Sequence, residues 1–500
     1  MTGEPPAQGG SLAQIMAERA RKAAELGTAG VRPWGVDFTP DHSCVEAAGL
    51  APAVPGEAGP QVRVAGRLLR LRPSGGIAFA DCFDATGRLQ LMARMDGPAP
   101  RLVELLSGLD LGDIVGATGA MGRTARGEPT LDLQELTLLA KALRPPAGKH
   151  SGVVDQELRY RRRYLDLLST PQHQVAFRQR SAILRALRQV LDGAGFLEVE
   201  TPILQPIPGG GEARPFITHH NALGTDFYLR IALELHLKRL LVGGLERVYE
   251  MGRVFRNEGL SPRHNPEFTL LEAYAAYGDR STMMTLSEQL VGAAAEAARA
   301  IGPVPDSTAR LTPPFRRSSM SDLVGAALGT DPLALWDRPE KLAEAGRRRG
   351  ASIPERAPVG ELFFALYEQL VEPNLRDPVF VTDYPVEVSP LARRGPDPRF
   401  CERFELVVEG RELANAFSEL NDPLEQRRRL EDQARRRERG DLEVPPFDED
   451  FVEAIEYGMP PAGGIGLGVD RLVMLVLGAA NIRDVLLFPT LRLEEGAVPP

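Results

Sequence analysis

The sequence predicts an α+β protein in which a small OB-type β-barrel precedes a larger domain of helices and antiparallel strands. Residues 61–143 run as five short β-rich stretches, and a short helical pattern, PRLVELLSGLD, stands between the third and the fourth. This order is typical of an OB-type barrel. From about Phe177 onward, helical patterns alternate with antiparallel-looking strand pairs, and no βαβ unit repeats.

These changes of character predict the domain boundaries. A chain of 500 residues is longer than one hydrophobic core usually organises. We expect an N-terminal extension over residues 1–60, with a helix over 11–26, and the barrel over 61–143. A linker with an arginine-rich helix follows over 144–175, and the larger domain covers 176–500. Within that domain, a helical insertion at about 300–375 receives no assigned chemistry.

The composition is that of an ordinary globular protein, with 43% hydrophobic and 25% charged residues. The net charge of -9 argues mildly against a protein that coats itself in nucleic acid. No apolar run of about 18 residues could cross a membrane, and residues 1–10 lack a signal-peptide pattern. Cys44, Cys82 and Cys401 are too few and too scattered for a disulfide framework, so a cytoplasmic protein is expected.

Familiar nucleotide-binding loops are missing from the sequence. There is no GxxxxGK[ST] loop, and the glycine run at 463–468 is not a GxGxxG motif after a strand. Any nucleotide site must therefore be built in another way.

The segment RSAILRALRQVLDGAGFLEVETPIL combines a helix with a strand. An apolar helical stripe is formed by Ile183, Leu184, Leu187, Val190 and Leu191. Gly193 and Gly195 end the helix, and a strand leads on to Pro202. Taken alone, the segment predicts only a core helix and strand.

The segment VYEMGRVFRNEGLSPRHNPEFTLLEAYAAY is more specific. Two strands flank a polar loop over residues 257–266, and on the returning strand Phe268, Leu270, Glu272 and Tyr274 share one face. A buried carboxylate such as Glu272 needs a positive partner. That partner is either an internal arginine or, where several carboxylates gather, a cationic substrate. Arg256, at the end of the first strand, can hold a phosphate with two parallel hydrogen bonds.

The segment GGIGLGVDRLVML predicts a glycine-rich strand followed by a helix that starts near Asp470. Glycine allows the backbone to come close to a ligand. Arg471, in the first helical turn, can cover a base or reach a phosphate.

The segment RFELVVEGRELANAFSELNDP predicts a hairpin with its turn at residues 409–410. Glu405 and Glu412 then become diagonal neighbours on one face, roughly 7 to 8 Å apart, and repel unless a cation lies between them. Mg²⁺ suits such a pair because it takes one or two carboxylates together with phosphate oxygens. Asn415, Phe417 and Glu419 fall on the other face, so a bulge between Glu412 and Asn415 is needed if all line one site.

Together, three of these segments resemble the signature motifs of class II aminoacyl-tRNA synthetases. From about Val62 to Arg492, the chain resembles the lysyl-tRNA synthetase family, through RYRRRYLDL, IPGGGEARPFITHHNAL, VSPLARR, RELANAFSELNDP, EYGMPPAGGIGLGVDR and IRDVLLFP. The resemblance implies activation of lysine with ATP and its transfer to the 3′-terminal adenosine of tRNA. It also implies a catalytic domain on an antiparallel sheet flanked by helices, an anticodon-binding barrel and a homodimer through the first segment. Ala416 departs from the glycine that is frequent there.

The resemblance also implies roles for single residues. Arg256 and Arg471 are the expected catalytic residues. The expected ATP contacts are Arg256, Glu258, His264, Asn265, Phe268, Glu405 and Arg471, with Phe268 and Arg471 on the two sides of the adenine and Arg256 on the α-phosphate. The expected Mg²⁺ ligands are Glu405 and Glu412. The expected lysine contacts are Gly210, Glu234, Arg256, Glu272, Tyr274, Asn415, Phe417, Glu419 and Gly468. The expected anticodon contacts are Arg72, Phe79, Gln90 and Glu135.

Several alternatives remain open from the sequence. A sister enzyme for aspartate or asparagine would share both domains, but Glu234, Glu272 and Glu419 together argue against it, because an aspartate-specific pocket needs cations there. A shortened relative that modifies a protein lacks the barrel, and a non-catalytic tRNA-binding scaffold has no reason to keep an ATP-metal site. The N-terminal helix is either a solvated helix or a tRNA-touching arm, and the arginines at 159–163 either form a solvated face or border the tRNA path.

Overall fold

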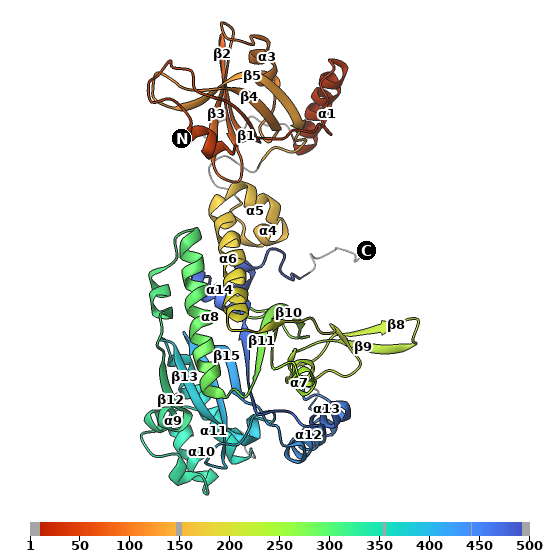
Figure 1. Cartoon of the computed structure of the whole chain (residues 1–500), viewed down its shortest axis with the longest axis vertical. Coiled ribbons are helices and arrows are strands. Elements are labelled where there is room, and N and C mark those ends of the chain that lie inside the picture. Colours follow the sequence, from red (N-terminus) through yellow and green to blue (C-terminus); the bar gives the residue numbers. More distant parts are fainter. Residues whose placement is uncertain (1–10, 147–152, 354–356, 442, 493–500) are drawn as a thin grey trace, which may run out of the picture. The chain divides into compact units, whose positions relative to one another are not determined.

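The computed structural model describes residues 11–146, 153–353, 357–441 and 443–492. The expected absence of a signal peptide at 1–10 and the central part of the predicted linker, 147–152, lie outside the described residues. The chain divides into two compact units (Figure 1). One comprises Met1–Gln156 with Tyr164–Ser169, and the other comprises Glu157–Arg163 with Thr170–Pro500.

The first unit contains a closed five-stranded barrel, as predicted for an OB-type fold. The strands are β1 (Gln61–Ser74), β2 (Ile77–Phe83), β3 (Arg88–Arg94), β4 (Ile114–Arg123) and β5 (Pro129–Ala140), in the order β1-β2-β3-β5-β4. Helix α3 (Arg101–Gly108) lies between β3 and β4 in the sequence, where the helical pattern predicted it. On β2, Ala78, Ala80 and Cys82 are buried in the barrel core. Phe79 therefore faces outward, because side chains alternate along a strand.

Helix α1 (Leu12–Thr28) packs against the barrel through polar contacts. Ser11 and Gln14 form a capping box at its start. Arg19 is buried, and its Nη1 donates to the carbonyl oxygens of Leu111 and Ala142 at 3.0 and 2.8 Å. The side of α1 that carries Arg19 and Ala23 is buried. The interpretation of α1 as a solvated terminal helix is therefore wrong for that side. A short helix, α2 (Cys44–Gly49), also contributes buried residues to the barrel core.

The second unit is built on an eight-stranded sheet in the order β12-β13-β14-β15-β16-β11-β10-β6. Its strands are β6 (Leu197–Glu198), β10 (Arg247–Phe255), β11 (Glu267–Ala276), β12 (Arg316–Ser319), β13 (Val379–Pro385), β14 (Phe400–Val408), β15 (Arg411–Ser418) and β16 (Ala462–Gly468). The pairs β10–β6 and β12–β13 are parallel and the other pairs are antiparallel. This confirms the predicted α+β architecture.

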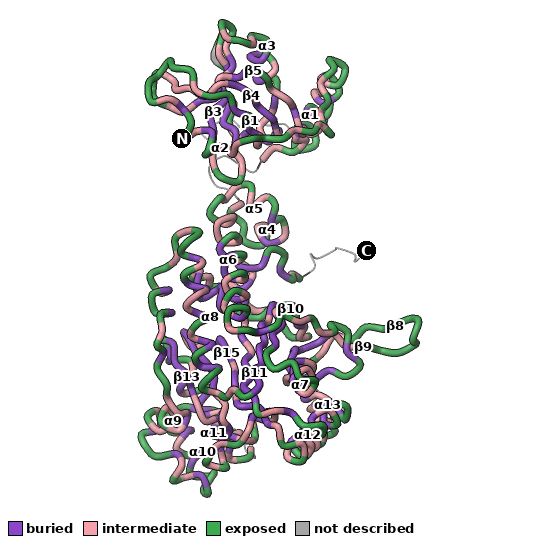
Figure 2. Tube along the Cα trace, viewed as in Figure 1, coloured by how far each residue is buried: buried purple, intermediate pink, exposed green. Residues whose placement is uncertain are grey.

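Three helices share the largest core with this sheet. They are α6 (Pro171–Gly193), α8 (Arg280–Ile301) and α14 (Val469–Leu477). Ile183, Leu187 and Leu191 of the predicted stripe are buried on α6. The buried residues run along the strands in Figure 2, whereas β8 and β9 are largely exposed.

The other elements of the described residues complete the two units. A second hydrophobic cluster joins α9 (Met320–Leu328), α10 (Pro339–Arg348) and α11 (Val359–Leu370) to β13. The small sheet contains β7 (Leu204–Gln205), β8 (Ile217–His220) and β9 (Thr225–Leu229). The other helices are α4 (Gln156–Arg161), α5 (Arg163–Ser169), α7 (Glu234–Val242), α12 (Pro423–Glu438), α13 (Glu449–Glu456) and α15 (Ile482–Val485).

Arg163, from the arginine-rich run, is fully buried in the second unit. Its guanidinium donates to the carbonyl oxygens of Leu487, Arg483 and Leu486 at 3.1, 2.9 and 3.0 Å. Burial of a guanidinium is tolerated because its donors are satisfied. For Arg163, the predicted solvated face is therefore wrong.

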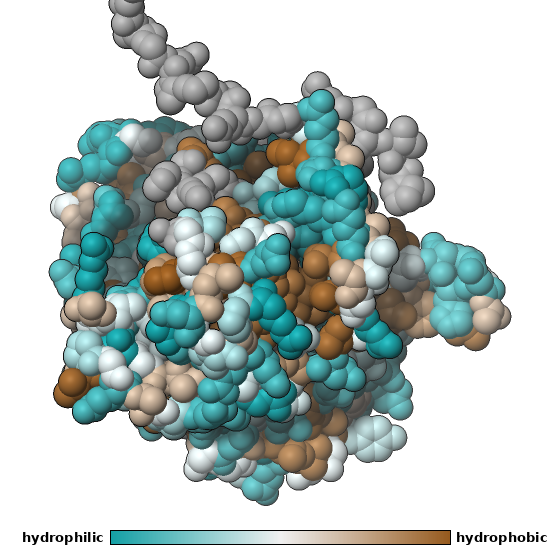
Figure 3. Space-filling model, turned by 90° about the horizontal axis from the view of Figure 1, so that it is seen from above, coloured by the Kyte–Doolittle hydropathy of each residue, from teal (hydrophilic) through white to brown (hydrophobic). Residues whose placement is uncertain are grey.

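Within the described residues, none of the helices combines the length and the apolar character that crossing a membrane requires. On the face drawn in Figure 3, hydrophilic side chains predominate, and hydrophobic ones form smaller groups between them.

Candidate active site

Strand β16 forms the floor of a cavity. Glycine occupies every second position of the strand, at 464, 466 and 468, so no side chains fill the space on that face. Gly464 lies opposite Tyr274 on one side and Phe417 on the other, and Gly466 lies between Glu272 and Asn415. A Cβ at position 464 would overlap Oε1 of Glu419 and lie 2.5 Å from Cε1 of Tyr274. The glycines thus leave room above β16 for side chains of the two neighbouring strands.

Strand β11 supplies one wall of the cavity. Phe268, Leu270, Glu272 and Tyr274 all line it, so the predicted shared face is confirmed. The predicted polar loop joins β10 to β11 and contributes further lining residues, including His264.

The hairpin of β14 and β15 supplies the opposite wall. Glu409 and Gly410 form its turn with φ of 51° and 67°, which is a two-residue turn with both central residues left-handed. Leu406 pairs with Ala414, but the next residue, Val407, pairs with Glu412, so Leu413 is the extra residue of a bulge. The bulge predicted after Glu412 is therefore confirmed. It allows Glu412 and Asn415 to line the same cavity.

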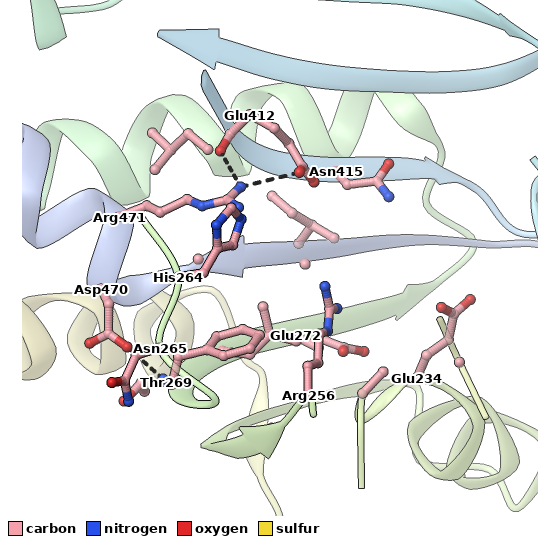
Figure 4. A pocket seen from close by; sticks show the side chains of 18 of the residues that line it. Glu234, Arg256, His264, Asn265, Thr269, Glu272, Glu412, Asn415, Asp470 and Arg471 are labelled. Carbon is pink, nitrogen blue, oxygen red and sulfur yellow. Dashed lines mark hydrogen bonds and ion pairs between the residues drawn. The ribbon is translucent and has the colours of Figure 1, made fainter. Parts of the chain in front are cut away.

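The start of α14 is fixed by the buried Asp470. Its Oδ2 accepts a hydrogen bond from the backbone of Thr269 at 2.7 Å, and its Oδ1 pairs with Arg180 at 2.6 Å. Arg471 consequently extends into the cavity, where its Nη1 donates to the carbonyl oxygen and to Oε2 of Glu412 at 2.8 and 3.2 Å. In Figure 4, Arg471 and Glu412 lie on one side of the cavity, and Arg256, Glu272 and Glu234 lie on the other.

The cavity collects residues from motifs that are far apart in the sequence. It is lined by Gly210, Glu234, Arg256, Glu258, His264, Asn265, Phe268, Glu272, Tyr274, Glu412, Asn415, Phe417, Gly468 and Arg471, among others. These are the residues that the sequence proposes for ATP, lysine and Mg²⁺, except Glu405 and Glu419.

The acidic part of the cavity centres on Glu272. Its Oε1 accepts from the backbone N–H of Leu233 at 3.0 Å, and its Oε2 accepts from the hydroxyl of Tyr274 at 2.8 Å. Burial, and next the charge of Glu234, raise the pKa of Glu272 to about 7. Among the ion pairs of the described residues, none joins Glu272 to an arginine or lysine. The sequence left two partners open for Glu272, an internal arginine or a cationic substrate. Within the described residues, no arginine pairs with it.

Glu419 does not line the cavity but lies behind it. It is fully buried and forms an ion pair with Lys238, and Lys238 also donates to Glu234 at 2.6 Å. Burial raises the pKa of Glu419 to about 8, although Lys238 opposes the shift. An internal ammonium group is thus already present beside the acidic part of the cavity, next to Phe417, whose ring centroid lies 5.3 Å from its Nζ.

The basic part of the cavity contains two guanidinium groups. The Cζ of Arg256 lies 5.3 Å from the ring centroid of Phe268, and Arg471 is held by Glu412. Burial lowers the pKa of His264, and the charge of Arg471 adds to this shift. Asn265 also lines the cavity, but its side-chain amide already bonds to the backbone. Nδ2 donates to the carbonyl oxygen of Glu267 at 2.6 Å, and Oδ1 accepts from the backbone N–H of Thr490 at 3.1 Å.

Carboxylates gather where the sequence proposes a metal. Burial, and next the charge of Glu412, raise the pKa of Glu405 to about 8. Arg403 donates to Oε1 of Glu405 at 2.7 Å. Burial, and next the charge of Glu412, also raise the pKa of Glu372 to about 6. No group of three or more His, Cys, Asp or Glu in the described chain is arranged as a metal site. Two carboxylates still fit Mg²⁺, which takes its other ligands from phosphates and water.

Three of the residues proposed for the anticodon lie on the outer face of β1, β2 and β3. Arg72 pairs in register with Phe79, and Gln90 pairs with Asp81. Gln90 is buried, and its Oε1 accepts from the hydroxyl of Thr130 at 2.9 Å. Glu135 lies on β5 and is exposed.

Family comparisons agree with this geometry. Residues 155–492 match the model of tRNA synthetases class II (D, K and N), and residues 62–139 match that of the OB-fold nucleic acid binding domain. A lysine–tRNA ligase of Moorella thermoacetica is 50% identical over 96% of this chain and 98% of its own length. The corresponding ligases of Syntrophomonas wolfei and Bacillus subtilis are 47% and 46% identical, over 96% and 95% of this chain and 98% and 96% of their own lengths.

The chain belongs to the lysine–tRNA ligase family of class II tRNA synthetases.

Three residues of this family member's site were missed in the sequence. Lys238 follows Glu234 by four residues on α7, and this spacing could have predicted their ion pair. Arg403 alternates with Glu405 on β14, and its Nε donates to Oδ1 of Asn415 at 3.0 Å. Glu372 lies in the segment to which no chemistry was assigned, and no sequence pattern pointed to it.

Proposed function

We propose that this chain activates L-lysine with ATP to form lysyl-adenylate and pyrophosphate, and then transfers lysine to the 3′-terminal adenosine of tRNA(Lys). One observation carries the proposal. The same cavity holds carboxylates without an arginine partner, Glu272 foremost, and guanidinium groups at Arg256 and Arg471. An aliphatic ammonium and a triphosphate therefore both find complementary charges in it.

The lysine side chain would lie over the glycine floor of β16. Its ammonium would be bound by Glu272 and the hydroxyl of Tyr274, with Glu234 and Glu419 adding negative charge. The remaining lysine contacts would come from Gly210, Arg256, Asn415, Phe417 and Gly468. Such an ammonium would make the ionised form of Glu272 favourable, which burial alone does not.

ATP would occupy the basic part of the cavity. Its adenine would lie between Phe268 and Arg471, and its α-phosphate would be bound by Arg256. Glu258, His264 and Asn265 would complete the ATP site. Glu405 and Glu412 would hold Mg²⁺, which when bound supplies neutralising charge to the phosphates.

Positioning and electrostatics would provide most of the catalysis. The carboxylate of lysine attacks the α-phosphorus in line, and Arg256 stabilises the charge that develops on the phosphate oxygens. Pyrophosphate leaves. The 3′-hydroxyl of the terminal ribose of the tRNA then attacks the carbonyl carbon of the lysyl-adenylate, an ester bond forms as the bond to phosphate breaks, and AMP leaves while the hydroxyl loses its proton. No residue has to act as a dedicated general base in the first step.

The same proposal extends to binding of tRNA, assembly and location. The anticodon would be bound on the barrel by Arg72, Phe79, Gln90 and Glu135. A homodimer would form through the segment that follows α6, where Leu197, Ile203 and Leu204 are exposed apolar residues. A cytoplasmic location is supported by three buried free cysteines, Cys44, Cys82 and Cys401.

The direct test is ATP–pyrophosphate exchange with each of the twenty amino acids. We expect exchange with lysine far above that with aspartate, asparagine or arginine. Exchange that depends on aspartate or asparagine, and not on lysine, would reject the proposal. Analytical ultracentrifugation of the same preparation tests the homodimer.

A further inference from the structure

A buried carboxylate lies beneath three arginines on the outer face of the barrel. Asp81, on β2, is fully buried, although it belongs to the face that points away from the barrel core. Its carboxylate pairs with Arg72 at 3.0 Å, Arg88 at 3.4 Å and Arg70 at 3.8 Å. Strand β1 supplies Arg70 and Arg72, and strand β3 supplies Arg88. One negative group therefore collects positive groups from both neighbouring strands.

The arginines cover Asp81 but are themselves open to solvent. The side chains of Arg70 and Arg72 are 62% and 51% exposed. Arg88 is less available, because it also pairs with Glu128. A buried carboxylate is costly unless its partners are fixed around it, so this arrangement holds the guanidinium groups in place at the surface. Fixed guanidinium groups lose less freedom when they bind a phosphate.

These arginines are adjacent to the aromatic ring on the same face. Phe79 is two residues from Asp81 on β2 and pairs in register with Arg72, whereas Arg70 pairs with Asp81. A base-stacking ring flanked by cations is the arrangement with which barrels of this type hold single-stranded nucleic acid. The outer face of β2 and β3 is also where OB-type barrels bind oligonucleotides.

We propose that Asp81 is a positioning residue that holds Arg70 and Arg72 over the outer face of the barrel, and that Arg70 binds a backbone phosphate of single-stranded RNA beside the base stacked on Phe79. The inference rests on the proposed tRNA-binding function of the barrel. It adds Arg70 as a phosphate contact and Asp81 as the group that orients both arginines.

Replacing Asp81 by asparagine separates positioning from simple attraction. Asp81→Asn removes a negative charge, so attraction alone predicts tighter binding of tRNA. Loss of positioning predicts the opposite, a dissociation constant about 10-fold higher and a weaker dependence on salt. Filter binding of tRNA(Lys) at several salt concentrations measures both quantities. Unchanged or tighter binding by a folded Asp81→Asn protein would overturn the proposal, and circular dichroism establishes that the variant is folded.

Replacing Arg70 by alanine gives an independent test that leaves Arg72 and Arg88 paired with Asp81, and Arg70 is both exposed and the most distant of the three partners. We expect weaker binding of tRNA and a salt slope reduced by about 1, as for one lost phosphate contact. The matched control is Arg101→Ala, which removes an exposed arginine at the start of α3. Equal effects of the two substitutions would show that only net charge matters, and would reject a specific contact.

Lysine-dependent ATP–pyrophosphate exchange distinguishes this inference from the proposed function. The Asp81 and Arg70 variants should retain wild-type exchange, because neither residue lines the catalytic cavity. Normal exchange together with normal tRNA binding in both variants would reject the inference and leave the proposed activity intact. Absence of exchange in the wild-type protein would instead reject the proposed activity.

Discussion

At the scale of single residues, the ionised carboxylate of Glu272 destabilises the folded protein although it is suited to binding an ammonium group. Its carboxylate is buried, accepts two hydrogen bonds and has a pKa of about 7. Because this value exceeds the ordinary 4.5, the folded state binds the proton more tightly than the unfolded state. The stabilising contribution is therefore complete below about pH 4.5 and is lost as the pH rises through about 7.

Substitution of Glu272 by glutamine should stabilise the folded protein and lower its catalytic efficiency with lysine. The shift corresponds to about 3 kcal/mol of ionisation cost at pH 8, so Glu272→Gln should raise the melting temperature at pH 8 and change it little at pH 5. The catalytic efficiency with lysine should fall roughly 100-fold, because a charge-assisted bond to the ammonium is lost. Thermal melts and exchange kinetics measure both. The control is Glu267→Gln, an exposed position on β11, and similar results for both variants would contradict the role of Glu272.

Arg256 is the second residue on which the mechanism depends. Arg256→Ala should reduce lysine-dependent exchange by at least about 100-fold, since a single preorganised donor to developing charge contributes on that order. The control is Arg253→Ala on the same strand, where the arginine pairs with Glu267 at 3.5 Å and is exposed. Near-normal exchange in Arg256→Ala would refute its assignment to the α-phosphate.

Most residues that line the cavity could be predicted from the sequence. Which charged side chains are buried away from the cavity could not. Strand alternation placed Phe268, Glu272 and Tyr274 on one wall correctly, because that rule depends only on neighbouring residues. The position of Glu419 behind the cavity depends on Lys238, which arrives from a helix distant in sequence. Burial of Arg163 depends in the same way on carbonyl groups near the C-terminal end of the described chain. Such tertiary contacts have no local signal.

At the scale of elements, the glycines of β16 determine the depth of the cavity. A Cβ at Gly464 would meet Glu419 and Tyr274, whereas a Cβ at Gly466 would have its nearest neighbour, Cγ of Glu272, at 3.8 Å. The two positions thus differ in the room available, although both belong to the same strand and the same face.

This difference predicts unequal effects of two alanine substitutions. Gly464→Ala should destabilise the protein by about 1–3 kcal/mol through overpacking and should raise the KM for lysine. Gly466→Ala should change stability by less than about 1 kcal/mol, because the added methyl group fits. Chemical denaturation and exchange kinetics measure the outcome. A larger loss of stability at Gly466 than at Gly464 would contradict the described floor of the cavity.

The β14–β15 hairpin was also predictable at this scale. Its turn residues require a left-handed backbone, and the need to bring Glu412 and Asn415 to one site required a bulge between them. The packing of α1 on the barrel was not predictable, because it depends on carbonyl groups of residues about 100 positions away, such as Leu111 and Ala142.

At the scale of the whole molecule, each unit has its own hydrophobic core. Independent cores predict more than one calorimetric unfolding transition. Leu91 is fully buried in the barrel, and Leu91→Ala should cost about 2–5 kcal/mol there. It should lower one transition and leave lysine-dependent exchange at 25 °C unchanged. A single transition that moves as a whole would show that the two units unfold together.

The most direct test of the binding account is calorimetric titration of lysine near pH 7 in buffers with different ionisation enthalpies. In the free protein, the raised pKa of about 7 keeps Glu272 partly protonated. A bound ammonium favours the carboxylates, so we predict net release of protons on lysine binding, and less release at pH 9. Lysine binding with no release of protons near pH 7 would contradict an acidic cavity that becomes ionised around its substrate.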